Sequence, residues 1–245
     1  MKIDFHRYKD IDFKDPVAII GFPSIGLVSS IAASFLARGL ELELAGGMSS
    51  EGFPPYAVVQ GGMPLPPIRV YAAARCNDDD GGIDCDGLIV ITSEVVPKPE
   101  QQHPLAVYIL EWLRGHNVKK VINLEGIPQY GLDETVLLGV GSSDYARGLM
   151  DRYGVDLLTD GMVRGMSGIM LFKAPDYGVD VMTLLITAST ELPDPRAAAK
   201  LMEPLARILP EISVDTEPLY REAEEIDKRM RTQIEDRRDD ERIYG

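Results

Sequence analysis

The sequence has little positive charge and few of the residues that most often build catalytic or metal sites. It holds 25 Lys and Arg against 39 Asp and Glu, a formal net charge of −14, with three histidines and two cysteines in 245 residues. An acidic surface repels phosphate backbones and anionic lipid headgroups, so neither nucleic acid nor a membrane is expected as a partner. A cationic pocket on another protein is a better match.

Long hydrophobic runs are also missing. Although 45% of the residues are hydrophobic, no apolar run reaches the length of a membrane span. The first ten residues are too polar for a secretory signal. We therefore expect a cytoplasmic protein with a sizeable core, organised as one globular domain over residues 1–212 followed by a charged C-terminal helix and docking tail over residues 213–245.

The cysteines and histidines form no catalytic or metal-binding pattern. Cys76 and Cys85 flank an acidic turn; a disulfide across it is one alternative, and two reduced thiols are the state that a cytoplasm favours. His6, His103 and His116 have no partner at metal-ligand or triad spacing. We interpret them as solvated or helix-capping residues, and we expect no metal, no cofactor and no catalytic residue.

Apolar runs of strand length alternate with segments of helical periodicity along most of the chain. Such alternation is typical of a largely parallel sheet with helices on both faces. We predict an α/β fold, a three-layer α/β/α sandwich with a mostly parallel sheet. The expected strands cover residues 17–21, 40–45, 56–60, 68–74, 87–92, 120–124 and 179–187, and the expected helices cover 25–36, 100–114, 142–153, 166–172 and 195–209.

Two serines and two glutamates follow predicted strands or begin predicted helices, near the carboxyl ends of the strands where α/β proteins bind their ligands. Ser24 and Ser167 lack the glycine spacing of a nucleophile elbow, so we interpret each as a helix cap. Glu125 should lie at the carboxyl end of a central strand, and Glu94 beyond another strand is placed to face the same crevice. We expect both glutamates to accept hydrogen bonds from loop amides. Ser24, Glu125 and Ser167 are the candidate lining of a ligand crevice.

Three segments together resemble the proteasome assembly chaperone 2 family of archaea. They are GFPSIGLV at residues 21–28, NLEG at 123–126 and GMVRGMSG at 161–168. The resemblance covers about residues 10–210 and implies an α/β/α domain similar to nucleoside phosphorylases and peptidyl hydrolases, and assembly into homo-oligomers. Some members are labelled ATP-grasp ligases, but the chain offers no glycine-rich lid and no Lys/Glu set for nucleotide and metal.

The last three residues, Ile243, Tyr244 and Gly245, follow a run of charged residues at 235–242. An apolar side chain, a phenol and a terminal carboxylate make a compact ligand for a pocket on another protein. This ending resembles the hydrophobic-tyrosine-any residue (HbYX) motif by which proteasome activators dock between α subunits of the core particle.

A hydrophobic stripe precedes the tail on one face of an expected helix. A helix lying on its own domain and a short oligomer seam both fit this stripe. Its members are Leu219, Ala223, Ile226, Met230 and Ile234.

These features favour a non-enzymatic, homo-oligomeric binding protein. It would act as a proteasome assembly chaperone or an ATP-independent activator that docks on the core particle α subunits through Ile243, Tyr244 and Gly245. The alternatives are a small-molecule-binding protein or enzyme that uses the crevice near Ser24, Glu125 and Ser167, and a binding protein of the same fold with a non-proteasomal partner.

Overall fold

The computed structural model describes residues 1–10, 15–73, 87–129, 135–212, 214–226 and 228. The expectations for Cys76 and Cys85, and for Ile243, Tyr244 and Gly245, lie outside these ranges. In the described part of the chain, no helix combines the length and the apolar character needed to cross a membrane.

Within the described residues, eight strands form one mixed sheet. The four central strands run parallel to one another, and the remaining strands pair antiparallel at the two edges. The strands are, in their order across the sheet, β1 (Asp4–Arg7), β3 (Glu43–Ser49), β6 (Ile68–Ala73), β7 (Leu88–Ser93), β2 (Val17–Gly21), β8 (Lys120–Pro128), β10 (Asp180–Ala188) and β9 (Leu137–Gly141).

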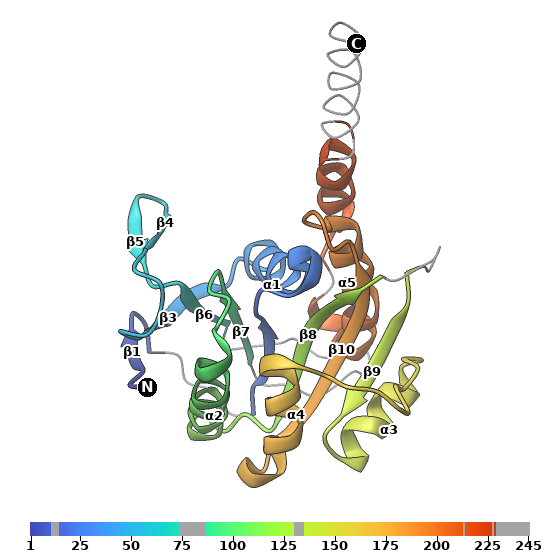
Figure 1. Ribbon diagram of the computed structural model, residues 1–245, viewed down its shortest axis with the longest axis horizontal. Helices are drawn as coiled ribbons and strands as arrows, with labels where there is room; N and C mark the ends of the chain where they lie inside the picture. The colour runs from blue at the N-terminus through green and yellow to red at the C-terminus, as the bar shows by residue number, and fades with distance from the viewer. Residues whose placement is uncertain (11–14, 74–86, 130–134, 213, 227, 229–245) are drawn as a thin grey trace, which may run out of the picture.

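Helices cover both faces of this sheet, which confirms the predicted α/β/α sandwich (Figure 1). Two separate clusters of buried apolar side chains mark the two interfaces between layers. On one face lie α1 (Val28–Gly39), α3 (Asp144–Arg152) and α5 (Pro195–Ile208), and on the other lie α2 (Pro99–Gly115) and α4 (Gly165–Tyr177).

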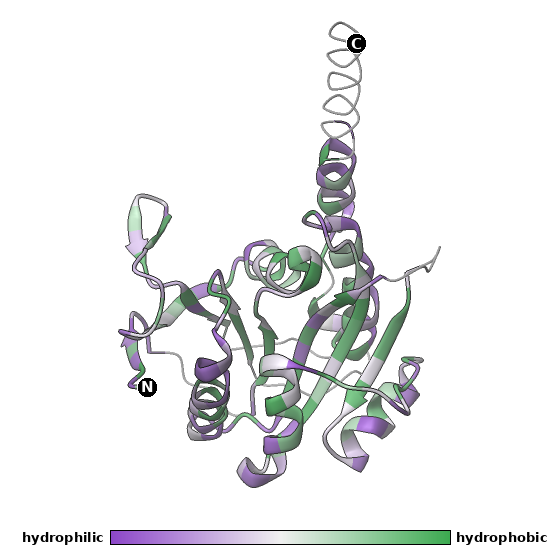
Figure 2. Ribbon diagram, in the orientation of Figure 1, coloured by the Kyte–Doolittle hydropathy of each residue, from purple (hydrophilic) through white to green (hydrophobic). Residues whose placement is uncertain are grey.

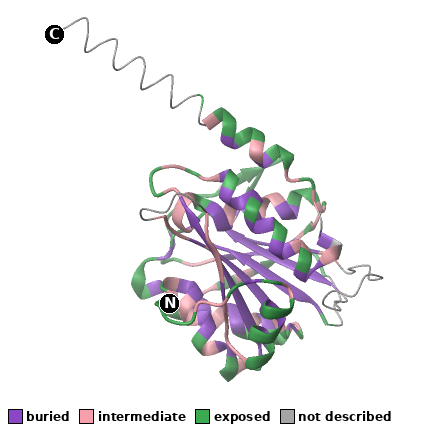
Figure 3. Ribbon diagram, turned by 90° about the vertical axis from the view of Figure 1, so that its right-hand side faces the viewer, coloured by how far each residue is buried: buried purple, intermediate pink, exposed green. Residues whose placement is uncertain are grey.

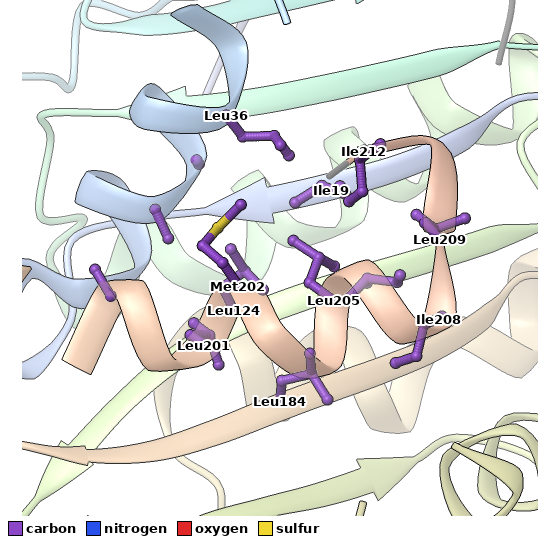
Figure 4. Close-up of a cluster of buried hydrophobic side chains, with 14 of the residues drawn as sticks. Ile19, Leu36, Leu124, Leu184, Leu201, Met202, Leu205, Ile208, Leu209 and Ile212 are labelled. Carbon is purple, nitrogen blue, oxygen red and sulfur yellow. The ribbon is translucent and has the colours of Figure 1, made fainter. Parts of the chain in front are cut away.

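The central strands are buried on both sides, while the helices expose their outer surfaces (Figure 3). Helix α5 shows how the sequence achieves this, because Asp194 caps its first turn by accepting a hydrogen bond from the Ala197 amide at 2.9 Å. Its apolar side then packs on the sheet and on α1, with Met202 and Leu205 near Leu36 (Figure 4). Each such buried side chain contributes roughly 1.5–3 kcal/mol of stabilisation.

Several elements differ from the sequence-based expectation. β8 and α4 are longer than predicted, and the strand expected at residues 40–45 begins at Glu43 and ends at Ser49. β1 was not predicted because its sequence is polar, and β9 was not predicted because Gly139 and Gly141 interrupt its apolar pattern. Antiparallel edge strands tolerate both features better than central strands do.

A further helix covers residues 217–226 and extends from the α5 side of the body away from the sheet (Figures 1 and 2). Its Leu219 is 1% exposed and joins the core cluster beneath α5, and Ala223 is also buried. The first half of the predicted hydrophobic stripe therefore packs on its own domain. Met230 and Ile234 lie outside the described residues.

Candidate functional site

Two of the three segments that carried the resemblance touch each other at the carboxyl edge of the sheet. The Gly126 amide donates a hydrogen bond to Ser24 Oγ at 3.0 Å, and the Ser24 and Ser29 hydroxyls lie 2.6 Å apart. A β-carbon at Gly126 would stand only 2.2 Å from the Ile25 carbonyl oxygen. The turn after β2 and the end of β8 thus form one closely packed unit in which residue 126 has to be glycine.

Ser24 does not cap a helix through its side chain, contrary to the prediction. It occupies the N-cap position of a short 3₁₀ helix, Ile25–Leu27, but its hydroxyl makes no capping hydrogen bond there. α1 begins only at Val28, after Gly26 and Leu27 have both taken positive φ values of 63° and 52°. The kinked backbone removes Ser24 from the start of α1 and turns its hydroxyl toward β8.

The third segment meets β8 one residue earlier. Ser167 in the first turn of α4 donates a hydrogen bond to Glu125 Oε2. Because the N-cap of α4 is Arg164, the predicted capping role of Ser167 is also wrong. Burial raises the pKa of Glu125 to about 7, and the hydrogen bond from Ser167 acts in the opposite direction.

A polar pair lies deeper under α4 on the same face of the sheet. Asn123 and Thr183 stand opposite each other on β8 and β10, and both are at least 97% buried, with exposed fractions of 3% and 0%. Asn123 Nδ2 and Thr183 Oγ1 have no hydrogen-bond partner among the described residues. Buried polar groups without a partner are uncommon, so this row of Asn123, Glu125 and Thr183 is a polar interruption of an otherwise apolar layer.

Glu94 faces the opposite side of the sheet, so the prediction that it shares a crevice with Glu125 is wrong. It accepts two hydrogen bonds from the Arg69 guanidinium, at 2.6 and 2.5 Å, on the face covered by α1. Arg69 is 4% exposed. Burial lowers the pKa of Arg69, but the hydrogen bonds to Glu94 and Tyr71 outweigh it and leave that pKa raised.

Among the described residues, a guanidinium and a hydroxyl donate to these glutamates in place of the loop amides that the sequence analysis expected. The Arg69–Glu94 ion pair was missed by the sequence analysis. The available signal was a single arginine inside the apolar strand IRVYAA, since an arginine in a buried strand requires a carboxylate near it.

The histidines take structural positions. His116 is the C-cap residue of α2, where its Nδ1 donates to the Trp112 carbonyl at 2.7 Å and its ring stacks on the Trp112 ring. This confirms the capping interpretation for His116. His6 lies in β1 with Nε2 at 2.7 Å from Ser49 Oγ, and His103 lies within α2. Among the residues that the structure describes, no three His, Cys, Asp or Glu side chains gather into a metal site.

The carboxyl edge therefore offers limited chemistry. A carboxyl with a pKa near neutrality can exchange a proton at neutral pH. Ser167 places a hydroxyl beside this carboxyl. Burial and the hydrogen bond from that hydroxyl are the two influences on the Glu125 pKa. Among the described residues, Ser167 donates to Glu125 and to no histidine, so the arrangement differs from a hydrolytic triad, in which an imidazole activates the hydroxyl.

The fold and the site define an α/β/α protein whose characteristic motifs pack against one another at the carboxyl edge of a mixed sheet. The chain belongs to the PAC2 family, whose sequence profile matches residues 18–234. It is 32% identical over 221 residues to the "uncharacterized protein MJ0106" of Methanocaldococcus jannaschii, covering 90% of this chain and 86% of that protein.

Two crystal structures from Pyrococcus furiosus share this architecture. PbaA, described as an archaeal homolog of proteasome-assembly chaperone, is 32% identical with a TM-score of 0.82, and the match covers 99% of this chain and 97% of PbaA. PbaB, described as an archaeal proteasome activator, has a TM-score of 0.79 at 20% identity and covers 94% of this chain and 98% of PbaB. At that identity, PbaB supports the fold alone.

Proposed function

We propose that this protein is a cytoplasmic, homo-oligomeric and non-enzymatic proteasome factor, an assembly chaperone or an ATP-independent activator. The observation that carries the proposal is the 32% identity to PbaA, a homolog of proteasome-assembly chaperone, over 99% of this chain. The terminal residues Ile243, Tyr244 and Gly245 supply the HbYX sequence for docking on the core particle α subunits.

In this proposal each terminal group has a separate task. Ile243 fills an apolar groove between two α subunits, and Tyr244 packs and hydrogen-bonds beside it. The Gly245 carboxylate pairs with a lysine at the base of the pocket. Docking opens the entrance of the core particle only if the open state binds the tail more tightly than the closed state.

Oligomerisation would strengthen docking without any new contact. Several identical tails facing several equivalent pockets raise the effective concentration of each tail for its pocket. Leu219 anchors the helix at residues 217–226 to the body, so this helix would hold the same position on the body in every copy of an oligomer.

A second candidate is a small-molecule-binding protein or enzyme that uses the crevice near Ser24, Glu125 and Ser167. The observation in its favour is the raised pKa of Glu125 beside a buried serine hydroxyl. Glu125→Gln separates the two hypotheses, because it removes proton exchange from the crevice and leaves the tail untouched. A nucleoside, peptide or ATP turnover that this substitution abolishes would establish the enzyme instead.

Capture of core particles by the N-terminally tagged full chain tests the docking proposal, since an N-terminal tag leaves the Gly245 carboxylate free. Wild type should retain core particles, and Tyr244→Ala should lose them. Tyr244→Phe keeps the ring and removes the hydroxyl, so we expect partial retention. Equal capture by wild type and Tyr244→Ala would show that the tail does not carry docking.

A further inference from the structure

A groove runs along α1, on the face of the sheet opposite Glu125. Two adjoining cavities of about 270 and 360 Å³ form it, and both are lined by Ser34, Arg38 and Glu94. The first cavity reaches β4 (Val58–Gln60), which pairs with β5 (Met63–Leu65) in a hairpin that projects from the body (Figure 1). The second cavity reaches Glu222 of the C-terminal helix. Together they have the size of a ligand site.

A directional chain of hydrogen bonds fixes the chemistry at the hairpin end. Arg69 can only donate, and its Nε donates to Tyr71 Oη at 3.1 Å. The Tyr71 hydroxyl therefore donates onward to Gln60 Oε1, at 2.7 Å. With its oxygen accepting this bond, Gln60 keeps its Nε2 group as a donor for anything that enters the cavity.

Arg38 adds a second donor at the same end. It stands in the last turn of α1, lines both cavities, and makes no ion pair or hydrogen bond through its side chain in the described structure. Glu94, the carboxylate that lines both cavities with Arg38, is already held by two bonds from Arg69. The hairpin end thus presents unused donors, which suit a group that only accepts hydrogen bonds.

The other end of the groove carries exposed apolar side chains among polar ones. Leu27 and Val96 remain 42% and 67% exposed there, beside Ile31. Ile31 and Arg38 are seven residues apart on α1, which is about 10 Å along a helix axis. Three steps of an extended polypeptide in the polyproline II conformation span nearly the same distance, at roughly 3.1 Å each, and its three residues per turn bring the first and fourth side chains to the same side.

We propose that this groove binds an extended segment of a partner polypeptide that carries a carboxylate about 10 Å from an apolar side chain. The carboxylate binds Arg38 and Gln60, and the apolar side chain covers Leu27 and Val96. Glu222 lines the apolar end and repels a negative charge there, so the segment has one orientation. This site is separate from the C-terminal tail and requires no part of it.

Amide chemical shifts of the ¹⁵N-labelled full chain test the proposal, with the peptide acetyl-Leu-Ser-Ser-Glu-amide as the probe. Shifts should move along α1 and at Val96, and the dissociation constant should rise about tenfold in Arg38→Gln, as the loss of one charge-assisted hydrogen bond predicts. Arg114→Gln is the matched control, because Arg114 stands in the last turn of α2 and is remote from the groove.

Gln60→Glu is a sharper variant. It preserves the acceptor for Tyr71 but replaces the donor with a carboxylate, so binding should fall at least as far as in Arg38→Gln while the fold is retained. Peptides in which Gln replaces the Glu, or Ser replaces the Leu, of the probe should each bind wild type more weakly than the probe does. The assignment of a peptide site would be overturned if wild type and Arg38→Gln bound the peptide equally, or if no amide shift changed at millimolar peptide. Octanoate that bound as tightly as the peptide and depended on Arg38 would overturn it as well.

Discussion

Glu94 and Glu125 stand at the same edge of one sheet and have opposite environments. Glu94 lies on the α1 face, its side chain is 42% exposed, and it pairs with the buried Arg69. Glu125 lies on the α4 face, is largely buried and has a hydroxyl as its partner. The comparison shows two ways of partnering a carboxylate at this edge, a buried guanidinium for Glu94 and a hydroxyl for Glu125. For Glu125 the hydroxyl does not offset burial, which raises its pKa.

The largest expected effect comes from removing the charge of Glu94. Glu94→Gln leaves the Arg69 guanidinium buried without its counterion. Losing one partner of a fully buried pair typically costs 3–5 kcal/mol, and because the Glu94 side chain is 42% exposed we expect the lower end of that range, about 3 kcal/mol. Urea unfolding at neutral pH measures this. Glu111→Gln, on the exposed side of α2, serves as the control and should change stability little. A loss no larger than that of the control would refute a strong Arg69–Glu94 pair.

The pH dependence of stability tests the other side of the comparison. The pKa of Glu125 is about 7 in the folded chain against 4.5 for the free group, so the folded state favours the protonated carboxyl. Its contribution is complete below pH 4.5 and is lost as pH rises through about 7, a change of up to about 3 kcal/mol.

Glu125→Gln should remove this part of the pH dependence, because the amide does not titrate and can still accept from Ser167. Denaturant unfolding of wild type and variant between pH 4 and pH 8 compares the two slopes. Parallel curves would mean that Glu125 has an ordinary pKa in the folded protein.

A smaller effect is expected from Ser167→Ala. The hydroxyl bond lowers the pKa of Glu125, so its removal should raise that pKa further and cost about 1 kcal/mol of stability above neutral pH. Carboxyl ¹³C titration of Glu125 gives the direction directly. A lowered pKa in the variant would contradict the assigned role of Ser167.

The sequence predicted the layers of the fold because short apolar runs rich in Val and Ile, such as VAIIG and LIVIT, alternate with longer segments of helical periodicity. It also placed Glu125 and Glu94 at the correct edge of the sheet. It did not show which face each side chain takes, since strands buried on both faces have no polar side to set the register. The predicted capping roles of Ser24 and Ser167 were wrong. The kink at Gly26 separates Ser24 from the start of α1, and Arg164 is the N-cap residue of α4.

In the function proposed above, the terminal carboxylate, not the crevice, attaches this protein to the proteasome. Adding one residue after Gly245 keeps the Ile243 and Tyr244 side chains but moves the carboxylate by up to about 3.5 Å, which is too far for an unchanged ion pair. The decisive measurement is the affinity of the full chain for purified core particles, with and without that one added residue. We predict at least a tenfold loss, about 1.4 kcal/mol, with the oligomeric state unchanged. Equal affinity of the two chains would contradict docking through the C-terminal carboxylate.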